Sequence, residues 1–103
     1  HDMFTILEFL QFEDLGFAEK GEGWTAVEEG RTEMDGEIPI NPSGGLKSKG
    51  HPLGASGVAQ LHEIYEQLTG GAGPRQLDDP GVGVTCNVGG FGNCVITTVL
   101  EEA

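Results

Sequence analysis

The chain has 103 residues, of which 37% are hydrophobic, and its 17 acidic and 5 basic side chains give a formal net charge of −12 at pH 7. This length supports at most one small domain, and the charge argues against nucleic acid and anionic membranes as partners, because both would repel it. Like charge on an ordinary soluble surface explains the composition, and so does adaptation to high salt, where ions screen such a surface.

The first residues predict an amphipathic helix from Asp2 to Asp14. Asp2 is a suitable N-cap, and apolar side chains recur at the helical spacing of three and four, at Met3, Ile6, Leu7 and Leu10. Residues 17–37 are acidic and rich in glycine, and within them WTAVEEG favours a short helix. EIPIN, residues 37–41, then predicts a short strand, in which the proline favours an edge position or a strand start.

The second half of the sequence predicts one helix and two strands. An apolar stripe indicates a helix from Ala55 to Thr69, which a glycine pair ends. CVITTVLEE, residues 94–102, is rich in β-branched residues and predicts a strand after a glycine turn. VGVTCNV, residues 82–88, predicts the strand before that turn, with one face formed by Val82, Val84, Cys86 and Val88. Helices and strands in this order indicate an α/β fold.

The stretch NPSGGLKSKGHPLGASG, residues 41–57, places His51 among glycines just before the second predicted helix. Amides at a helix start attract anions or developing negative charge, and histidine is the usual general base near neutral pH. No acidic residue lies within residues 38–62, whereas Lys47 and Lys49 do, which is consistent with a loop that is buried or faces an anion. A solvated histidine in a flexible loop is the alternative interpretation.

The two cysteines, Cys86 and Cys94, lack metal-ligand spacing and are expected to be free thiols in a reducing, cytoplasmic setting. Nothing resembles a signal peptide or a membrane-spanning run. Cys86 lies near the end of its predicted strand, before the glycines of CNVGGFG, whose backbone amides could bind an oxyanion beside a reactive thiol. A small buried side chain on an alternating strand is the other interpretation.

Taken together, NPSGGLKSKGHPLGASG and CNVGGFG resemble the C-terminal part of a thiolase, and HDMF resembles the His-Asp-x-Phe segment of sterol-carrier-protein-type and archaeal-type thiolases. The resemblance spans His1 to about Leu100. It implies an acetyl-CoA acetyltransferase or 3-ketoacyl-CoA thiolase, which performs Claisen condensation or thiolytic cleavage in lipid metabolism such as fatty acid β-oxidation. Residues 1–103 would form an incomplete C-terminal half-domain, a mixed sheet with covering helices whose first strands lie outside the chain, so that EIPIN could not pair as in the family.

The resemblance also implies roles for individual residues. His51 matches the histidine that activates the nucleophilic cysteine and helps to hold the substrate thioester oxygen. Cys86 matches the cysteine that moves a proton at the α-carbon of the incoming acyl-CoA. His1 stands where many thiolases have the Asn that polarises the same oxygen through water. Main-chain amides near Gly89 and Gly90 would lie by a second oxyanion hole.

Departures from the family pattern qualify this assignment. Position 88 is valine where many thiolases have glycine, and sterol-carrier-type relatives often have histidine at the position of Cys86. The acyl-accepting cysteine has no counterpart here, so this chain alone would be inactive and the rest of the thiolase would supply that thiol.

The resemblance implies acyl-CoA as the substrate, no tightly bound cofactor, no metal and a homo-oligomer when complete. Some relatives work with a zinc-ribbon and OB-fold partner. A thiolase-like retro-aldolase acting on β-hydroxyacyl-CoA and a non-catalytic acyl-CoA or lipid carrier are the alternatives.

Overall fold

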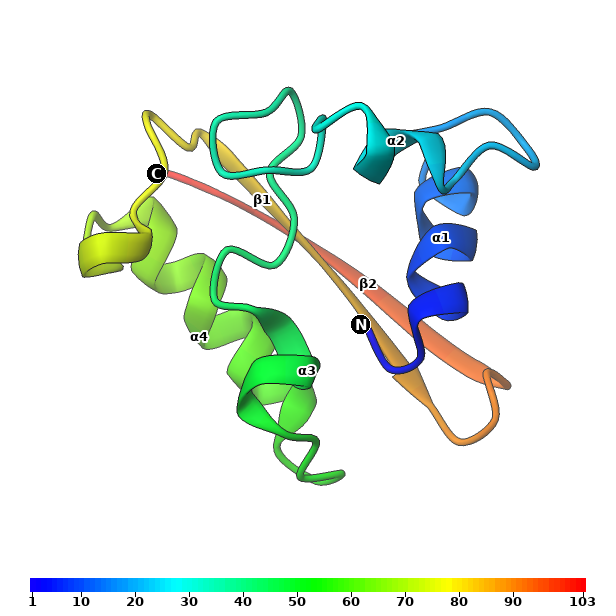
Figure 1. The fold of residues 1–103 in the computed structure, drawn as a ribbon. Coiled ribbons are helices and arrows are strands. Elements are labelled where there is room, and N and C mark those ends of the chain that lie inside the picture. Colours follow the sequence, from blue (N-terminus) through cyan, green and yellow to red (C-terminus); the bar gives the residue numbers. More distant parts are fainter. The chain divides into compact units, whose positions relative to one another are not determined.

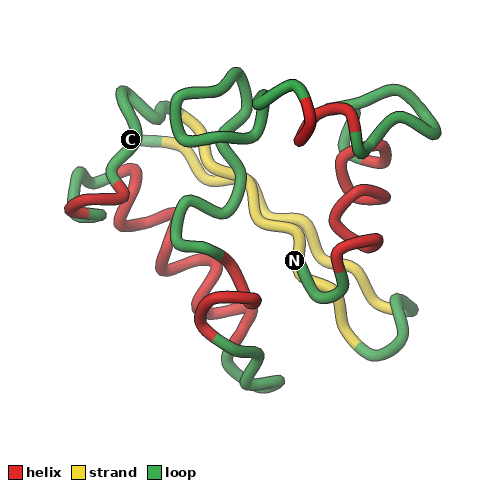
Figure 2. The backbone as a smooth tube through the Cα atoms, viewed as in Figure 1, coloured by secondary structure: helices red, strands yellow, loops and turns green.

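The computed structural model describes all 103 residues, which divide into two compact units, residues 1–49 and residues 50–103. Together the units contain four α-helices, one 3-10 turn and a two-stranded antiparallel sheet (Figures 1 and 2). This is the predicted α/β class. No helix is both long enough and apolar enough to cross a membrane.

The first unit contains α1 (Thr5–Asp14), α2 (Thr25–Glu28) and α3 (Gly45–Lys49). The short helix predicted within WTAVEEG is α2, whereas α3 was not predicted. α1 begins three residues later than predicted, because Asp2 caps a different helix. The Asp2 carboxylate accepts hydrogen bonds from the backbone N–H groups of Leu46 (2.7 Å) and Lys47 (3.1 Å) in the first turn of α3. The first backbone amides of a helix have no partner inside it, so a carboxylate there completes their bonding.

Residues 37–41 do not form the predicted strand. Two backbone bonds hold this segment: Ile38 N–H donates to the carbonyl of Arg31 (2.9 Å) and Ile40 N–H to the carbonyl of Thr32 (3.1 Å). Pro39, between the two donors, has no N–H and cannot bond to a partner on the other side. The apolar residues are therefore held in a local loop, and no ladder develops.

The second unit contains α4 (Ser56–Leu68), a 3-10 turn η1 (Gly73–Arg75) and the hairpin of β1 (Val82–Gly89) and β2 (Cys94–Glu101). All but the 3-10 turn were predicted, with helix ends correct to one residue. The hairpin is antiparallel and in register from Val82 opposite Glu101 to Gly89 opposite Cys94.

α4 packs against β1 on the face that carries its small and polar residues. Thr85 is buried, and the Ile64 side chain occupies the space that a side chain at Gly83 would need. Because side chains alternate across a strand, the predicted apolar face lies on the opposite side of the hairpin, at Val82, Val84, Cys86 and Val88. The alternation was therefore predicted correctly, and α4 covers the other face.

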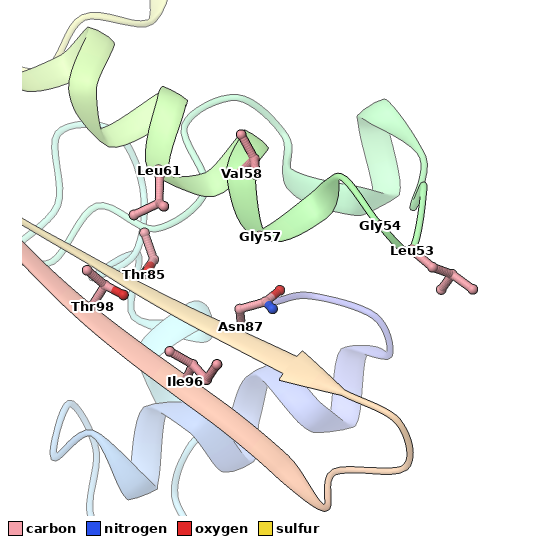
Figure 3. Close-up of a pocket in the computed structure, with 9 residues that line it drawn as sticks. All are labelled: Leu53, Gly54, Gly57, Val58, Leu61, Thr85, Asn87, Ile96 and Thr98. Atoms are coloured by element: carbon pink, nitrogen blue, oxygen red, sulfur yellow. The ribbon is translucent and has the colours of Figure 1, made fainter.

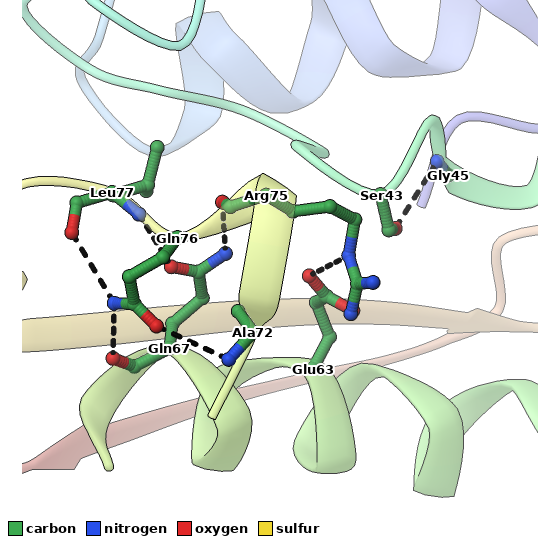
Figure 4. Close-up of polar contacts among 8 residues, drawn as sticks. All are labelled: Ser43, Gly45, Glu63, Gln67, Ala72, Arg75, Gln76 and Leu77. Carbon is green, nitrogen blue, oxygen red and sulfur yellow. Dashed lines mark hydrogen bonds and ion pairs between the residues drawn. The ribbon is translucent and has the colours of Figure 1, made fainter. Parts of the chain in front are cut away.

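A side-chain network fixes the chain after α4 (Figure 4). Gln67 is 4% exposed, and its amide donates to the carbonyl of Arg75 (2.8 Å) and accepts from Leu77 N–H (2.9 Å). Gln76 in turn donates to the carbonyl of Gln67 (2.9 Å) and accepts from Ala72 N–H (3.1 Å). The last turn of a helix leaves carbonyls without partners, and here a glutamine satisfies one of them.

Candidate active site

His51 is half-buried and held through its ring. Its Nδ1 lies 2.7 Å from the Oγ of Ser56, the first residue of α4. Ser56 is 2% exposed, and its hydroxyl also donates to the carbonyl of Pro52 (3.2 Å). The same carbonyl accepts from the amides of Ala55 (2.8 Å) and Ser56 (3.0 Å), which forms the tight turn into the helix. The imidazole is thus anchored to a helix start, in contrast to a histidine that is only solvated.

A groove of about 290 Å³ lies between the start of α4 and the hairpin (Figure 3). Thr85 and Asn87 extend from β1 toward the helix. The groove is lined by Leu53, Gly54, Gly57, Val58 and Leu61 from the helix side and by Thr85, Asn87, Ile96 and Thr98 from the hairpin. Its walls are mainly apolar with a few hydroxyl and amide groups, the usual composition of a small-molecule site.

Cys86 is half-buried inside β1, opposite Thr97 of β2. It lies three residues before the end of the strand, because β1 continues to Gly89. Its neighbours in the strand, Thr85 and Asn87, line the groove. Strand alternation therefore places the Cys86 thiol on the other face of the hairpin. The second thiol, Cys94, is free and exposed at the start of β2.

Gly89 is the last residue of β1, and Gly90 begins the turn of the hairpin. Gly90 has φ +61°, and the Asn93 side chain occupies the space that a Cβ would need there. Asn93 Oδ1 accepts a hydrogen bond from Phe91 N–H (3.2 Å), and Gly92 N–H donates to the carbonyl of Gly89 (3.2 Å). Only glycine fits position 90, since both its dihedral and its surroundings exclude a side chain.

His1 belongs to the first unit, whereas His51, Cys86 and the two glycines belong to the second. The main-chain nitrogen of His1 donates to Gln11 Oε1 (3.2 Å), and Gln11 Nε2 donates to the carbonyl of His1 (2.7 Å). Gln11 is buried in α1. The first residue is therefore held at both ends of its main chain.

A side-chain hydrogen bond fixes the beginning of the glycine-rich stretch, residues 41–57. Asn41 Nδ2 donates to Glu8 Oε1 (2.8 Å) in α1. Burial raises the pKa of the Glu8 carboxyl, and the nearby Asp2 carboxylate raises it further. No group of three or more His, Cys, Asp or Glu side chains is placed to hold a metal ion.

Sequence reasoning missed these supporting residues. The motif pointed to His51 but not to its partner Ser56, although a serine at a helix start was a local signal. Nothing in the sequence pointed to the pairing of Asp2 with α3 or of Glu8 with Asn41, because each joins residues more than thirty positions apart.

Residues 1–102 match the family described as thiolase C-terminal domain-like. The chain is 58% identical over 102 residues to an acetyl-CoA acetyltransferase of Methanothermobacter thermautotrophicus, covering 99% of this chain and 27% of that protein. It is 47% identical over 101 residues to sterol carrier protein 2 of Homo sapiens, covering 98% and 18%. It is 43% identical over 89 residues to non-specific lipid-transfer protein-like 2 of Caenorhabditis elegans, covering 86% and 22%. The chain thus spans between 18% and 27% of the length of these relatives.

Proposed function

This chain belongs to the thiolase C-terminal domain family, and from that premise we propose that it supplies catalytic residues of an acyl-CoA thiolase. The reaction is thiolytic cleavage of a 3-ketoacyl-CoA, or the reverse Claisen condensation, with coenzyme A as substrate. The observation that carries the proposal is the fixed imidazole of His51, which is hydrogen-bonded to the buried hydroxyl of Ser56 at the start of α4. A general base needs such a fixed orientation to reach the proton that it transfers.

In this proposal the residues divide the proton transfers and the charge stabilisation. His51 takes the proton of the acyl-accepting thiol and then donates to the thioester oxygen. Cys86 moves the proton at the α-carbon from the face of the hairpin opposite the groove, while His1 polarises the thioester oxygen through water. Carbon–carbon cleavage beside a thioester passes through an enolate, so donors must face that oxygen. Amides at Gly89 and Gly90 would stabilise the second oxyanion, that of the acyl-enzyme.

The acyl-accepting thiol would come from outside these residues. Cys86 already has a role in the proposal, and Cys94 is the only other cysteine in the chain. The greater length of the relatives supports a further segment that brings this thiol. A homo-oligomer and a zinc-ribbon and OB-fold partner remain part of the proposal.

A non-catalytic acyl-CoA or lipid carrier is the second candidate. Relatives named sterol carrier protein 2 and non-specific lipid-transfer protein-like 2 favour it, and so does the mainly apolar groove beside α4. A carrier requires the groove but has no use for a proton-transferring imidazole. Turnover therefore separates the two candidates.

The test is thiolysis of acetoacetyl-CoA by the complete protein that carries this chain. We expect His51→Ala and Cys86→Ser each to lower kcat by about a hundredfold to ten-thousandfold. His62→Ala, which removes an exposed histidine of α4, is the matched control and should keep wild-type turnover. Wild-type turnover in His51→Ala would contradict the proposal. Binding of acyl-CoA without turnover would favour the carrier, and cleavage of β-hydroxyacyl-CoA instead would favour the aldolase.

A further inference from the structure

Ser56 occupies a position from which it can select the protonated nitrogen of His51. Its side chain is 2% exposed, so its hydroxyl bonds within the protein. The oxygen makes two contacts, with the Pro52 carbonyl at 3.2 Å and with His51 Nδ1 at 2.7 Å. We infer that Ser56 is a positioning residue that keeps the proton of the neutral imidazole on Nδ1. The inference deepens the role proposed for His51 in acyl transfer and rests on it.

Proton counting gives the direction of the two bonds. A hydroxyl has one hydrogen and two acceptor sites. When that hydrogen goes to the Pro52 carbonyl, which is an acceptor only, the shorter contact requires His51 Nδ1 to donate. The reverse arrangement, with the hydroxyl donating to Nδ1, would lose the bond from Ser56 Oγ to the Pro52 carbonyl, which would keep only its bonds from the amides of Ala55 and Ser56. Both bonds form together only when Nδ1 carries the proton.

This tautomer places the lone pair of the ring on Nε2. In the proposed reaction the proton of the acyl-accepting thiol moves to Nε2, which leaves a thiolate and an imidazolium. Nε2–H then donates to the thioester oxygen, while Nδ1–H remains bonded to Ser56 throughout. Neutral histidine in water prefers its proton on Nε2, so without Ser56 much of the enzyme would lack a basic nitrogen facing the thiol.

The helix start that carries Ser56 is itself fixed to the hairpin. At the next residue, Gly57, a Cβ would lie 3.2 Å from the side-chain amide nitrogen, Nδ2, of Asn87 in β1. The close approach of helix and strand there holds the serine in place, because rigid elements position a functional side chain better than loops do. Ser56 is thus a fixed reference point for the ring.

The tautomer is measured by 15N chemical shifts of the histidine rings, in complete protein labelled at histidine and held at a pH where His51 is neutral. His51→Gln assigns the signals. We expect wild-type protein to show a protonated Nδ1, and Ser56→Ala to shift the population toward Nε2–H and to lower kcat/KM about tenfold, the effect of losing one neutral hydrogen bond. Thr69→Val is the matched control. It removes a hydroxyl that also donates to a carbonyl four residues back (2.8 Å), but at the opposite end of α4 from Ser56.

A wild-type signal from Nε2–H would overturn the inference, and this measurement requires no variant to fold. An unchanged tautomer in Ser56→Ala, or a shift of equal size in Thr69→Val, would also overturn it. An altered tautomer at unchanged kcat/KM would remove the positioning role. If His51→Gln keeps full thiolase activity, the proposed function fails, while the nitrogen shifts still decide whether Ser56 sets the tautomer.

Discussion

Replacing Asp2 with alanine should destabilise α3, more than forty residues further along the chain. Asp2 is 4% exposed, and its carboxylate is bonded to the amides of Leu46 and Lys47. Removing an N-cap costs about 0.5–2 kcal/mol, and a buried donor left without a partner costs about 1–3 kcal/mol. Because this cap is buried and serves two amides, we expect a loss of about 2 kcal/mol, at the upper end of the cap range.

Amide hydrogen exchange measures this loss locally. A free-energy change of about 2 kcal/mol corresponds to roughly thirtyfold faster exchange at Leu46 and Lys47. Asp2→Asn keeps one acceptor oxygen and should accelerate exchange by roughly the square root of that factor. Asp14→Ala, which removes an exposed carboxylate at the end of α1, is the control and should leave both amides unchanged.

The outcome also bears on the site, since Asp2 directly follows His1. If the cap fixes the main chain there, Asp2→Ala should lower thiolase turnover more than Asp14→Ala does. An acceleration below about twofold at Leu46, which is less than the smallest cap effect of about 0.5 kcal/mol, would refute the assignment of Asp2 as the cap.

Two further predictions concern polar side chains in the helices. The pKa of Glu8 is raised by burial and by Asp2, so its charged form weakens the fold at neutral pH. Glu8→Gln should therefore raise the urea midpoint near pH 7, and its advantage should shrink as acid protonates the wild-type carboxyl; an advantage that grows in acid would contradict this sign. In α4, Gln67→Met should cost about 1–3 kcal/mol by leaving Leu77 N–H without a partner. Gln60→Met should be neutral or stabilising, since Gln60 Oε1 is buried without a partner. Urea unfolding of the pair checks this, and equal losses would count against the network of Figure 4.

Periodicity predicted the elements that depend on neighbouring residues. The boundaries of α4 and β1 followed from apolar spacing and from the glycines after each, and β2 followed from its β-branched residues after a glycine turn. The strand predicted at residues 37–41 failed because β-propensity depends on a partner strand as well as on residue type. The helix α3 was missed because its five residues have little helical pattern and its cap, Asp2, comes from a distant part of the chain.

In the candidate site, too, local sequence patterns predicted some features, whereas others depend on contacts between elements. Two glycine-rich motifs and the family that they resemble predicted which residues carry the chemistry, and those roles stay predictions. The alternation of β1 predicted which residues share a face with Cys86, but not which face α4 would cover. That choice depends on the fit between Gly83 and Ile64, a contact between two elements that neither pattern contains. Sequence patterns therefore predicted the reactive groups, which stay predictions, but did not predict the groups that orient them.

Two glycines of the stretch from residue 41 to residue 57, Gly45 and Gly57, leave room for a neighbouring side chain, which explains them better than a need for flexibility. Within the first unit, the Asp2 carboxylate occupies the position that a side chain at Gly45 would need. Within the second unit, the Asn87 amide approaches Gly57 in the same way. In both cases a missing Cβ admits a polar side chain that fixes the backbone at a helix start. Gly45 and Gly57 thus help to fix the chain, because each gives a neighbouring carboxylate or amide access to the main chain. His51 lies just before the second of these helix starts, and its hydrogen bond to Ser56 there gives the ring one orientation, which a solvated loop could not provide.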